Sequence, residues 1–281
     1  MKQPLIYIFA FMLAAAALHA QETIDTAQFR AVYTFAYKTS SSQKEFVKTD
    51  LMYLDIGKKS SKYYSRYAQI RDSVKVAGLN QKLSAYEIVE NVRQFRDGIK
   101  TIVYSLPNSG MFYVADRLVD DYYYEEKYTL PRWVLGQETK TIAGYVCKEA
   151  ETIYRGRKWI AYYAPSIPVQ QGPWKLWGLP GLIVYATDSE HLFEFELNGF
   201  ETLKDGVPLI MENKTPTGKP YRKVSKKDWE KMERLNNRDP LTFTKQFIMG
   251  GKGEVYLTPE QKKADQDLRK KGGIPYIPLE K

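Results

Sequence analysis

The chain of 281 residues contains one cysteine and two histidines. Because the single cysteine, Cys147, cannot form an intramolecular disulfide, packing alone must stabilise the fold, and we expect Cys147 to be buried and inert. Zinc sites usually need several Cys or His ligands. Only His191 lies beyond the first 20 residues, so a Ser-His-Asp or Cys-His site would depend on this one side chain. The sequence therefore predicts no catalytic site of these kinds and no zinc site.

Other site patterns are also missing. The best candidate for a calcium site is a group of acids, Asp120, Asp121, Glu125 and Glu126, but their spacing is not that of an EF-hand. We interpret them as ordinary loop and strand acids and predict no metal. The glycine-rich run at residues 250–253 lacks the spacing of a phosphate-binding loop, so we predict no cofactor.

The first 20 residues resemble an export signal. Lys2 precedes an uncharged apolar run, Leu5–Leu18, and small residues follow up to Ala20, which is typical of a cleavable signal peptide over residues 1–20. No later apolar run reaches the roughly 20 residues that a transmembrane helix needs. We expect residues 21–281 to be exported to the periplasm, the outer membrane or the cell exterior, as one β-rich domain without a transmembrane segment.

The rest of the chain is rich in alternating patterns. Phe29, Ala31, Tyr33, Phe35 and Tyr37 share one face of an extended segment, which is the period of a half-buried strand. Further strands are expected at residues 46–56, 101–106, 111–117, 122–128, 133–139, 145–154, 158–164, 182–187 and 192–200. The sequence therefore predicts a mainly β (α+β) fold with a large curved antiparallel sheet.

A few helices are expected between and after these strands. Apolar residues from Tyr67 to Ala77 have helical spacing and are followed by Gly78, where we expect the helix to end. Ser84 with Glu87 forms a capping-box pattern, and Ser225 and Thr258 are placed to cap two later helices.

The most unusual segment is GPWKLWGLPGLIVY at residues 172–185. Trp174 and Trp177 precede Pro180-Gly181, whose residue types fit the centre of a type II turn, and Leu182 and Ile183 follow it. Two interpretations are open. The large side chains can plug the core at the start of a central strand, or the indoles can form a rim around an apolar or sugar ligand.

Within this segment, Gly178, Leu179, Pro180, Gly181, Leu182 and Ile183 spell GLPGLI. With these residues the chain resembles the GLPGLI family of exported Bacteroidetes proteins. The resemblance extends to Gly144–Ala150, Gly156-Arg157 with Trp159, Ile167-Pro168, Phe193–Phe195 and Tyr276–Leu279. It implies an exported envelope protein of unknown biochemical role. The strand pattern also resembles the half-barrel architecture of periplasmic lipoprotein carriers.

The function expected from these observations is binding rather than catalysis. We predict a non-enzymatic envelope protein that holds an apolar or amphipathic ligand or docks an envelope partner. The alternatives are a carboxylate-dependent hydrolase and an accessory of an outer-membrane transporter. The formal net charge of +9 is spread along the chain, and export argues against nucleic acid as a partner. The sequence does not indicate an oligomeric state.

Overall fold

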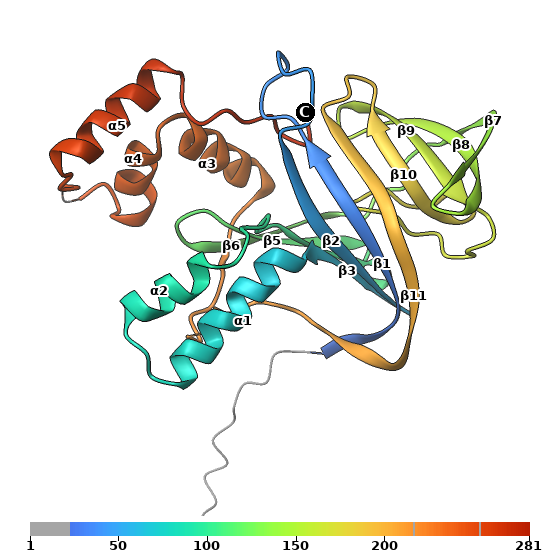
Figure 1. The fold of residues 1–281 in the computed structure, drawn as a ribbon, viewed down its shortest axis with the longest axis horizontal. Coiled ribbons are helices and arrows are strands. Elements are labelled where there is room, and N and C mark those ends of the chain that lie inside the picture. Colours follow the sequence, from blue (N-terminus) through green and yellow to red (C-terminus); the bar gives the residue numbers. More distant parts are fainter. Residues whose placement is uncertain (1–22, 216, 253) are drawn as a thin grey trace, which may run out of the picture.

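The computed structural model describes residues 23–281 except residues 216 and 253 (Figure 1). In this part of the chain, 12 strands form one sheet. They are β1 (Thr23–Tyr37), β2 (Lys48–Gly57), β3 (Ser61–Ser65), β4 (Ile102–Leu106), β5 (Met111–Arg117), β6 (Asp121–Lys127), β7 (Val134–Ile142), β8 (Tyr145–Tyr154), β9 (Arg157–Ala164), β10 (Leu182–Asp188), β11 (Phe193–Ile210) and β12 (Arg222–Lys223). The predicted signal peptide, residues 1–20, lies outside the described residues.

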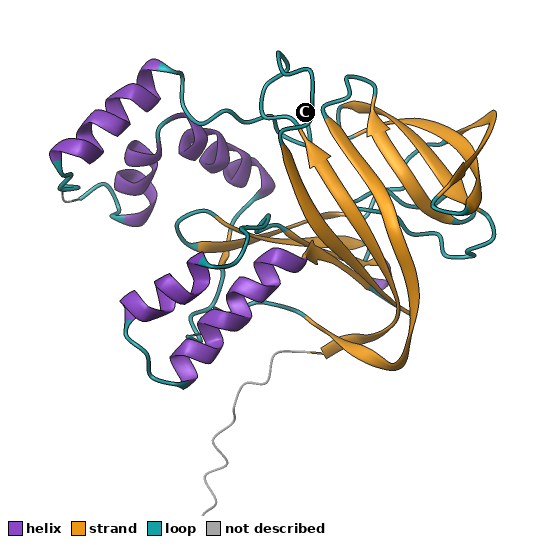
Figure 2. Cartoon of the chain, in the orientation of Figure 1, coloured by secondary structure: helices purple, strands orange, loops and turns teal. Residues whose placement is uncertain are grey.

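The sheet is open and strongly curved (Figure 2). Its strand order is β12-β6-β5-β4-β3-β2-β1-β11-β10-β9-β8-β7, so β12 and β7 form the two edges. All neighbouring strands are antiparallel except β12, which pairs with β6 in parallel and makes the sheet mixed. The pairing of β1 with β11 shifts register at three places, and such irregularities bend a strand and increase its twist. The predicted mainly β fold with a large curved sheet and a few helices is confirmed.

The described part of the chain also contains five helices, three of which begin at capping residues that the sequence indicates. They are α1 (Arg66–Asn80), α2 (Ala85–Arg93), α3 (Lys226–Arg238), α4 (Pro240–Phe243) and α5 (Pro259–Lys270), with two short turns, η1 (Pro107–Ser109) and η2 (Thr244–Ile248). Ser84 and Glu87 cap α2 reciprocally, Ser225 caps α3 and Thr258 caps α5. Across the described ranges 23–215, 217–252 and 254–281, we find no helix with the length and apolar character needed to cross a membrane.

The predicted end of the first helix is wrong. Helix α1 continues through Gly78 to Asn80. A Cβ atom at Gly78 would lie 2.8 Å from Cγ1 of Ile88 in α2. Glycine at this position therefore allows α1 and α2 to pack closely, and it does not end the helix.

The inner face of the sheet is the face that carries Ala31, Tyr33 and Phe35, which are all buried as the alternation in β1 predicts. Strand β3 extends this face, and its five residues are all buried. Strand β3 is not predicted from the sequence, because Ser61 and Lys62 give the segment a polar composition. Helices α3 and α4 cover part of the inner face, since Trp229, Met232 and Phe243 belong to the same apolar core.

Candidate functional site

A cavity of about 400 Å³ lies on the inner face of the sheet. Side chains of β1 to β6 and β11 form its floor, and α3, the segment around Trp174 and the last residues of the chain form its other walls. Ligand pockets in proteins typically enclose about 300–1,000 Å³. The cavity is therefore large enough for a small organic molecule.

The middle of the cavity is apolar and aromatic. The rings of Phe35 and Phe195 stack with centroids 4.5 Å apart, and Tyr63 meets Phe195 edge-on at 6.4 Å. Val103 and Val114 complete this part of the floor. These side chains come from five different strands, and cross-strand pairing places them on one face.

The GLPGLI segment contributes mainly to the core beside this cavity. Leu179, Leu182 and Ile183 are at most 1% exposed, and the carbonyl of Ile183 accepts a 2.7 Å hydrogen bond from the hydroxyl of Tyr33. Trp174 is 6% exposed and also lines the cavity.

Trp177 lies elsewhere. Its ring stacks on Tyr128 with centroids 4.1 Å apart, and its indole N–H donates to the carbonyl of Thr129 at 3.1 Å. Only one of the two indoles of this segment therefore faces the candidate ligand space.

The turn in this segment is tighter than the predicted type II turn. The backbone N–H of Gly181 donates to the carbonyl of Leu179 at 2.8 Å, which closes a three-residue turn around Pro180. Gly181 has φ +153°, and an added Cβ atom would lie 2.3 Å from the carbonyl oxygen of Ala164. Gly178 also has a positive φ, +91°. The close approach to Ala164 explains why glycine is needed at position 181.

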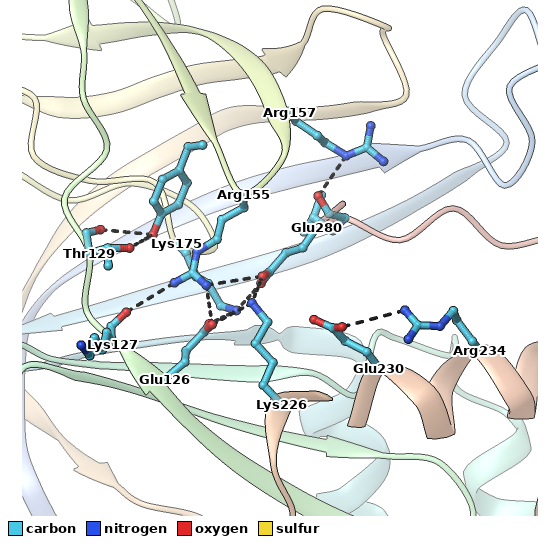
Figure 3. Close-up of polar contacts among 12 residues, drawn as sticks. Glu126, Lys127, Thr129, Arg155, Arg157, Lys175, Lys226, Glu230, Arg234 and Glu280 are labelled. Carbon is cyan, nitrogen blue, oxygen red and sulfur yellow. Dashed lines mark hydrogen bonds and ion pairs between the residues drawn. The ribbon is translucent and has the colours of Figure 1, made fainter. Parts of the chain in front are cut away.

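One end of the cavity contains a buried ionic cluster, which we define as Glu126, Arg155, Lys175, Lys226 and Glu280 (Figure 3). Lys175 is paired with both carboxylates and is 1% exposed. Lys226 also contacts both and lies 2.8 Å from Glu126. Burial alone would raise the pKa of Glu126, but its cationic partners outweigh burial and lower that pKa to about 2. Three cations and two carboxylates thus contact one another within the protein.

Arg157, which lies outside the ionic cluster, holds the last residues of the chain against the sheet. The guanidinium group of Arg157 donates to the carbonyls of Pro278 at 2.6 Å and Leu279 at 3.0 Å. It also pairs with Asp188 at 3.1 Å, and both side chains are 1% exposed. The predicted tight turn at Arg155-Gly156 brings Arg157 into place, and both turn residues have positive φ.

The cavity is also lined by two carboxyl groups that form no ion pair within the described part of the chain, Asp116 of β5 and Glu233 of α3. Asp116 accepts a 2.5 Å hydrogen bond from the hydroxyl of Thr101 and a 2.7 Å bond from the backbone N–H of Arg117. Burial raises the pKa of Asp116 to about 7, and the neighbouring Glu233 acts in the same direction. Burial also raises the pKa of Glu233, which interacts with Tyr276. Both carboxyl groups thus have raised pKa values.

The remaining residues considered from the sequence lie away from the cavity. His191 is exposed in the turn between β10 and β11. Cys147 is fully buried, and burial raises its pKa. Asp120 and Glu125 pair with Lys219 and Lys223 respectively.

These acids point to different partners, as do Asp121, which pairs with Arg117, and Glu126, which belongs to the ionic cluster. Within the described part of the chain, no group of three or more His, Cys, Asp or Glu residues is arranged to hold a metal ion.

The sequence analysis missed the polar residues of the cavity. Asp116, Glu233 and Glu280 come from segments far apart in the sequence, and no spacing rule connects them. Lys175 could have been noticed, because it is the one charged residue in the apolar run from Gly172 to Tyr185. A lysine in such a run needs a buried partner or a route to solvent.

The family comparison concerns a segment that ends within β10. Residues 149–185 match the family model "Protein of unknown function (Porph_ging)". This match fits a GLPGLI-type family of Bacteroidetes proteins, as the motif indicates. No curated protein matches the chain.

Solved structures titled "Structure of PNGF-II in C2 space group" and "Structure of PNGF-II in P21 space group" are similar at 11% and 10% identity, each with a TM-score of 0.47. Each alignment covers 73% of this chain, which spans 32% of the length of those chains.

Proposed function

We propose that this protein is an exported envelope protein that binds an apolar or amphipathic molecule in the cavity on the inner face of its sheet. The observation that carries the proposal is the cavity of about 400 Å³ with an aromatic middle and polar ends. Ligand sites in proteins commonly combine such an apolar lining with a few convergent polar groups.

The binding test uses an uncharged fluorescent hydrophobic dye, N-phenyl-1-naphthylamine, and a pair of matched variants. Val114→Phe adds volume inside the cavity, where Val114 is 1% exposed. Val146→Phe makes the same change on β8 at a position that is 63% exposed. We expect Val114→Phe to weaken dye binding at least about tenfold, which corresponds to about 1.4 kcal/mol. Val146→Phe should leave it unchanged.

Circular dichroism and urea unfolding check that each variant is folded. Ile277→Trp is a second cavity-filling variant, in case Val114→Phe does not fold, because Ile277 is a half-buried wall residue of the last segment. If a folded cavity-filling variant binds the dye as well as the unchanged protein does, the cavity is not the binding site and the proposal is wrong.

A carboxylate-dependent hydrolase is the second candidate, and one observation favours it. Asp116 and Glu233 line the same cavity, and both have raised pKa values. A raised pKa suits a carboxyl group for general acid catalysis near neutral pH. Turnover of a glycoside or ester substrate that is lost in Asp116→Asn would support this candidate over simple binding.

A further inference from the structure

The two ends of the cavity differ in how their charges are balanced. At the ionic cluster, Lys175 and Lys226 each contact both carboxylates. Elsewhere on the cavity wall, Asp116 and Glu233 form no ion pair with any residue that the structure describes. The neighbouring arginines are engaged elsewhere, because Arg117 pairs with Asp72 and Asp121, and Arg234 faces Glu230. Negative charge on the cavity wall is therefore uncompensated only at the Asp116 end.

Asp116 and Glu233 also retain acceptor capacity. A carboxylate has about four acceptor positions. Asp116 uses one oxygen for Thr101 and the other for the backbone N–H of Arg117. Glu233 interacts with the hydroxyl of Tyr276. A ligand with several N–H donors would find acceptors on both groups.

A second observation indicates that the cavity wall is built to meet a polar ligand. Tyr63 lines the cavity and is only 5% exposed. Its hydroxyl has no hydrogen-bond partner among the residues that the structure describes. Buried polar groups are nearly always hydrogen-bonded, because leaving one without a partner costs free energy. A polar substituent of a ligand would satisfy this hydroxyl.

Apolar and aromatic side chains line the same cavity as these polar groups. Phe35, Phe195 and Trp174 offer ring faces and edges to a hydrocarbon or aromatic body. A ligand whose apolar part occupies this region can place one polar end at Asp116 and Glu233.

We infer that the cavity selects an amphiphile with a protonated amine, whose ammonium group lies between Asp116 and Glu233 while its apolar part contacts Phe35, Phe195 and Trp174. This inference rests on the proposed binding function and specifies the ligand class. The ammonium group donates charge-assisted hydrogen bonds to both carboxylates, and these are stronger than bonds between neutral groups. A carboxylate amphiphile would instead place its anion beside these two acidic groups.

The test is competition against the bound dye by decylamine, decanol and decanoate, which have alkyl chains of equal carbon number and different head groups. We expect decylamine to bind about tenfold more tightly than decanol, the size expected for one hydrogen bond to a charged group in place of a neutral one. Asp116→Asn and Glu233→Gln should each weaken decylamine binding and leave decanol binding unchanged. Glu196→Gln, on the exposed side of β11, is the matched control.

Non-specific electrostatic attraction to the protein surface would favour the opposite of the expected result. The formal net charge of +9 favours decanoate over decylamine at the protein surface. A preference for the amine that depends on Asp116 thus reports the cavity rather than the overall charge of the protein.

The outcomes separate the inference from the proposed function. Equal binding of the three ligands, or an amine preference that Asp116→Asn leaves intact, overturns the amine inference while cavity binding stands. Preferred binding of decanoate that is lost in Lys175→Met also overturns the amine inference. That result would show that the head group of the ligand binds at the ionic cluster. Failure of the dye and all three ligands to bind the folded protein overturns both.

Discussion

Replacing Arg157 with alanine should destabilise the protein strongly, because this guanidinium group connects the sheet to the last residues of the chain. It lies 3.1 Å from the carboxylate of Asp188, and both side chains are 1% exposed. It also donates to the carbonyls of Pro278 and Leu279. Arg157→Ala removes all three interactions and leaves the Asp188 carboxylate buried without its cation.

The magnitude follows mainly from Asp188. Removing one partner of a buried ion pair typically costs about 3–5 kcal/mol, because the remaining charge is uncompensated. The carbonyls of Pro278 and Leu279 can regain water if the last segment moves away, so we add nothing for them. Total stabilities of proteins are about 5–15 kcal/mol, and the expected loss is a large part of that range.

Urea unfolding followed by circular dichroism measures this loss. With a slope of about 2 kcal/mol per M urea, the midpoint should fall by about 2 M. Arg234→Ala is the matched control, since Arg234 is 66% exposed and its Glu230 partner is 3.9 Å away. An exposed pair of this kind should change stability by no more than about 0.5 kcal/mol.

A second variant tests the physical reasoning. Asp188→Asn keeps an oxygen that can accept the backbone N–H groups of Leu192 and Phe193 but removes the charge. The double variant Arg157→Ala/Asp188→Asn should therefore be more stable than Arg157→Ala by at least about 1 kcal/mol. The reasoning is refuted if Arg157→Ala costs less than about 1 kcal/mol, or if the double variant recovers nothing.

Three further predictions concern the glycine of the motif and the two ends of the cavity. Gly181→Ala should lower the free energy of unfolding by about 1–3 kcal/mol, because its Cβ atom would meet the Ala164 carbonyl. Gly199→Ala is the control, since a Cβ atom there has open space and should cost much less. Equal losses of the two variants in urea unfolding would contradict this prediction. The folded pKa of Asp116, about 7, exceeds its ordinary value of 3.8, so its contribution to stability is present below about pH 4 and is lost as pH rises through 7. As pH rises from 4 to 7, the free energy of unfolding of Asp116→Asn should fall less than that of the unchanged protein. If the two free energies change with pH in parallel, the raised pKa of Asp116 is contradicted. Glu126 has the opposite sign, because its folded pKa of about 2 lies below the ordinary 4.5, and its contribution is lost as pH falls from about 4.5 to 2. The free energy of unfolding of Glu126→Gln should therefore depend less on pH in that window than that of the unchanged protein. An equal pH dependence of the two proteins would contradict the lowered pKa of Glu126.

Local sequence patterns determined much of the fold. The alternation in β1 predicts which side chains are buried, because successive residues of a strand point to opposite faces. The capping residues Ser84, Ser225 and Thr258 predict the starts of α2, α3 and α5, since the unpaired N–H groups of a first turn need a nearby acceptor. Such features depend on neighbours within a few residues, and the chain alone specifies them.

Tertiary structure decided the features that depend on distant neighbours. Strand β3 is buried despite its polar composition because β2 and β4 flank it and Lys62 pairs with Glu212. Gly78 looked like a helix end, but its role comes from the approach of α2.

The candidate site depended on tertiary structure most of all. The motif supplied Trp174, whereas Asp116, Glu233 and Glu280 reach the cavity from strand, helix and final segment. Burial and charge balance at these groups arise only when the curved sheet brings segments more than 100 residues apart into contact, as with Lys175 and Glu280. The spacing of residues in the sequence does not predict such contacts. The motif could therefore be recognised from the sequence, whereas the cavity could not.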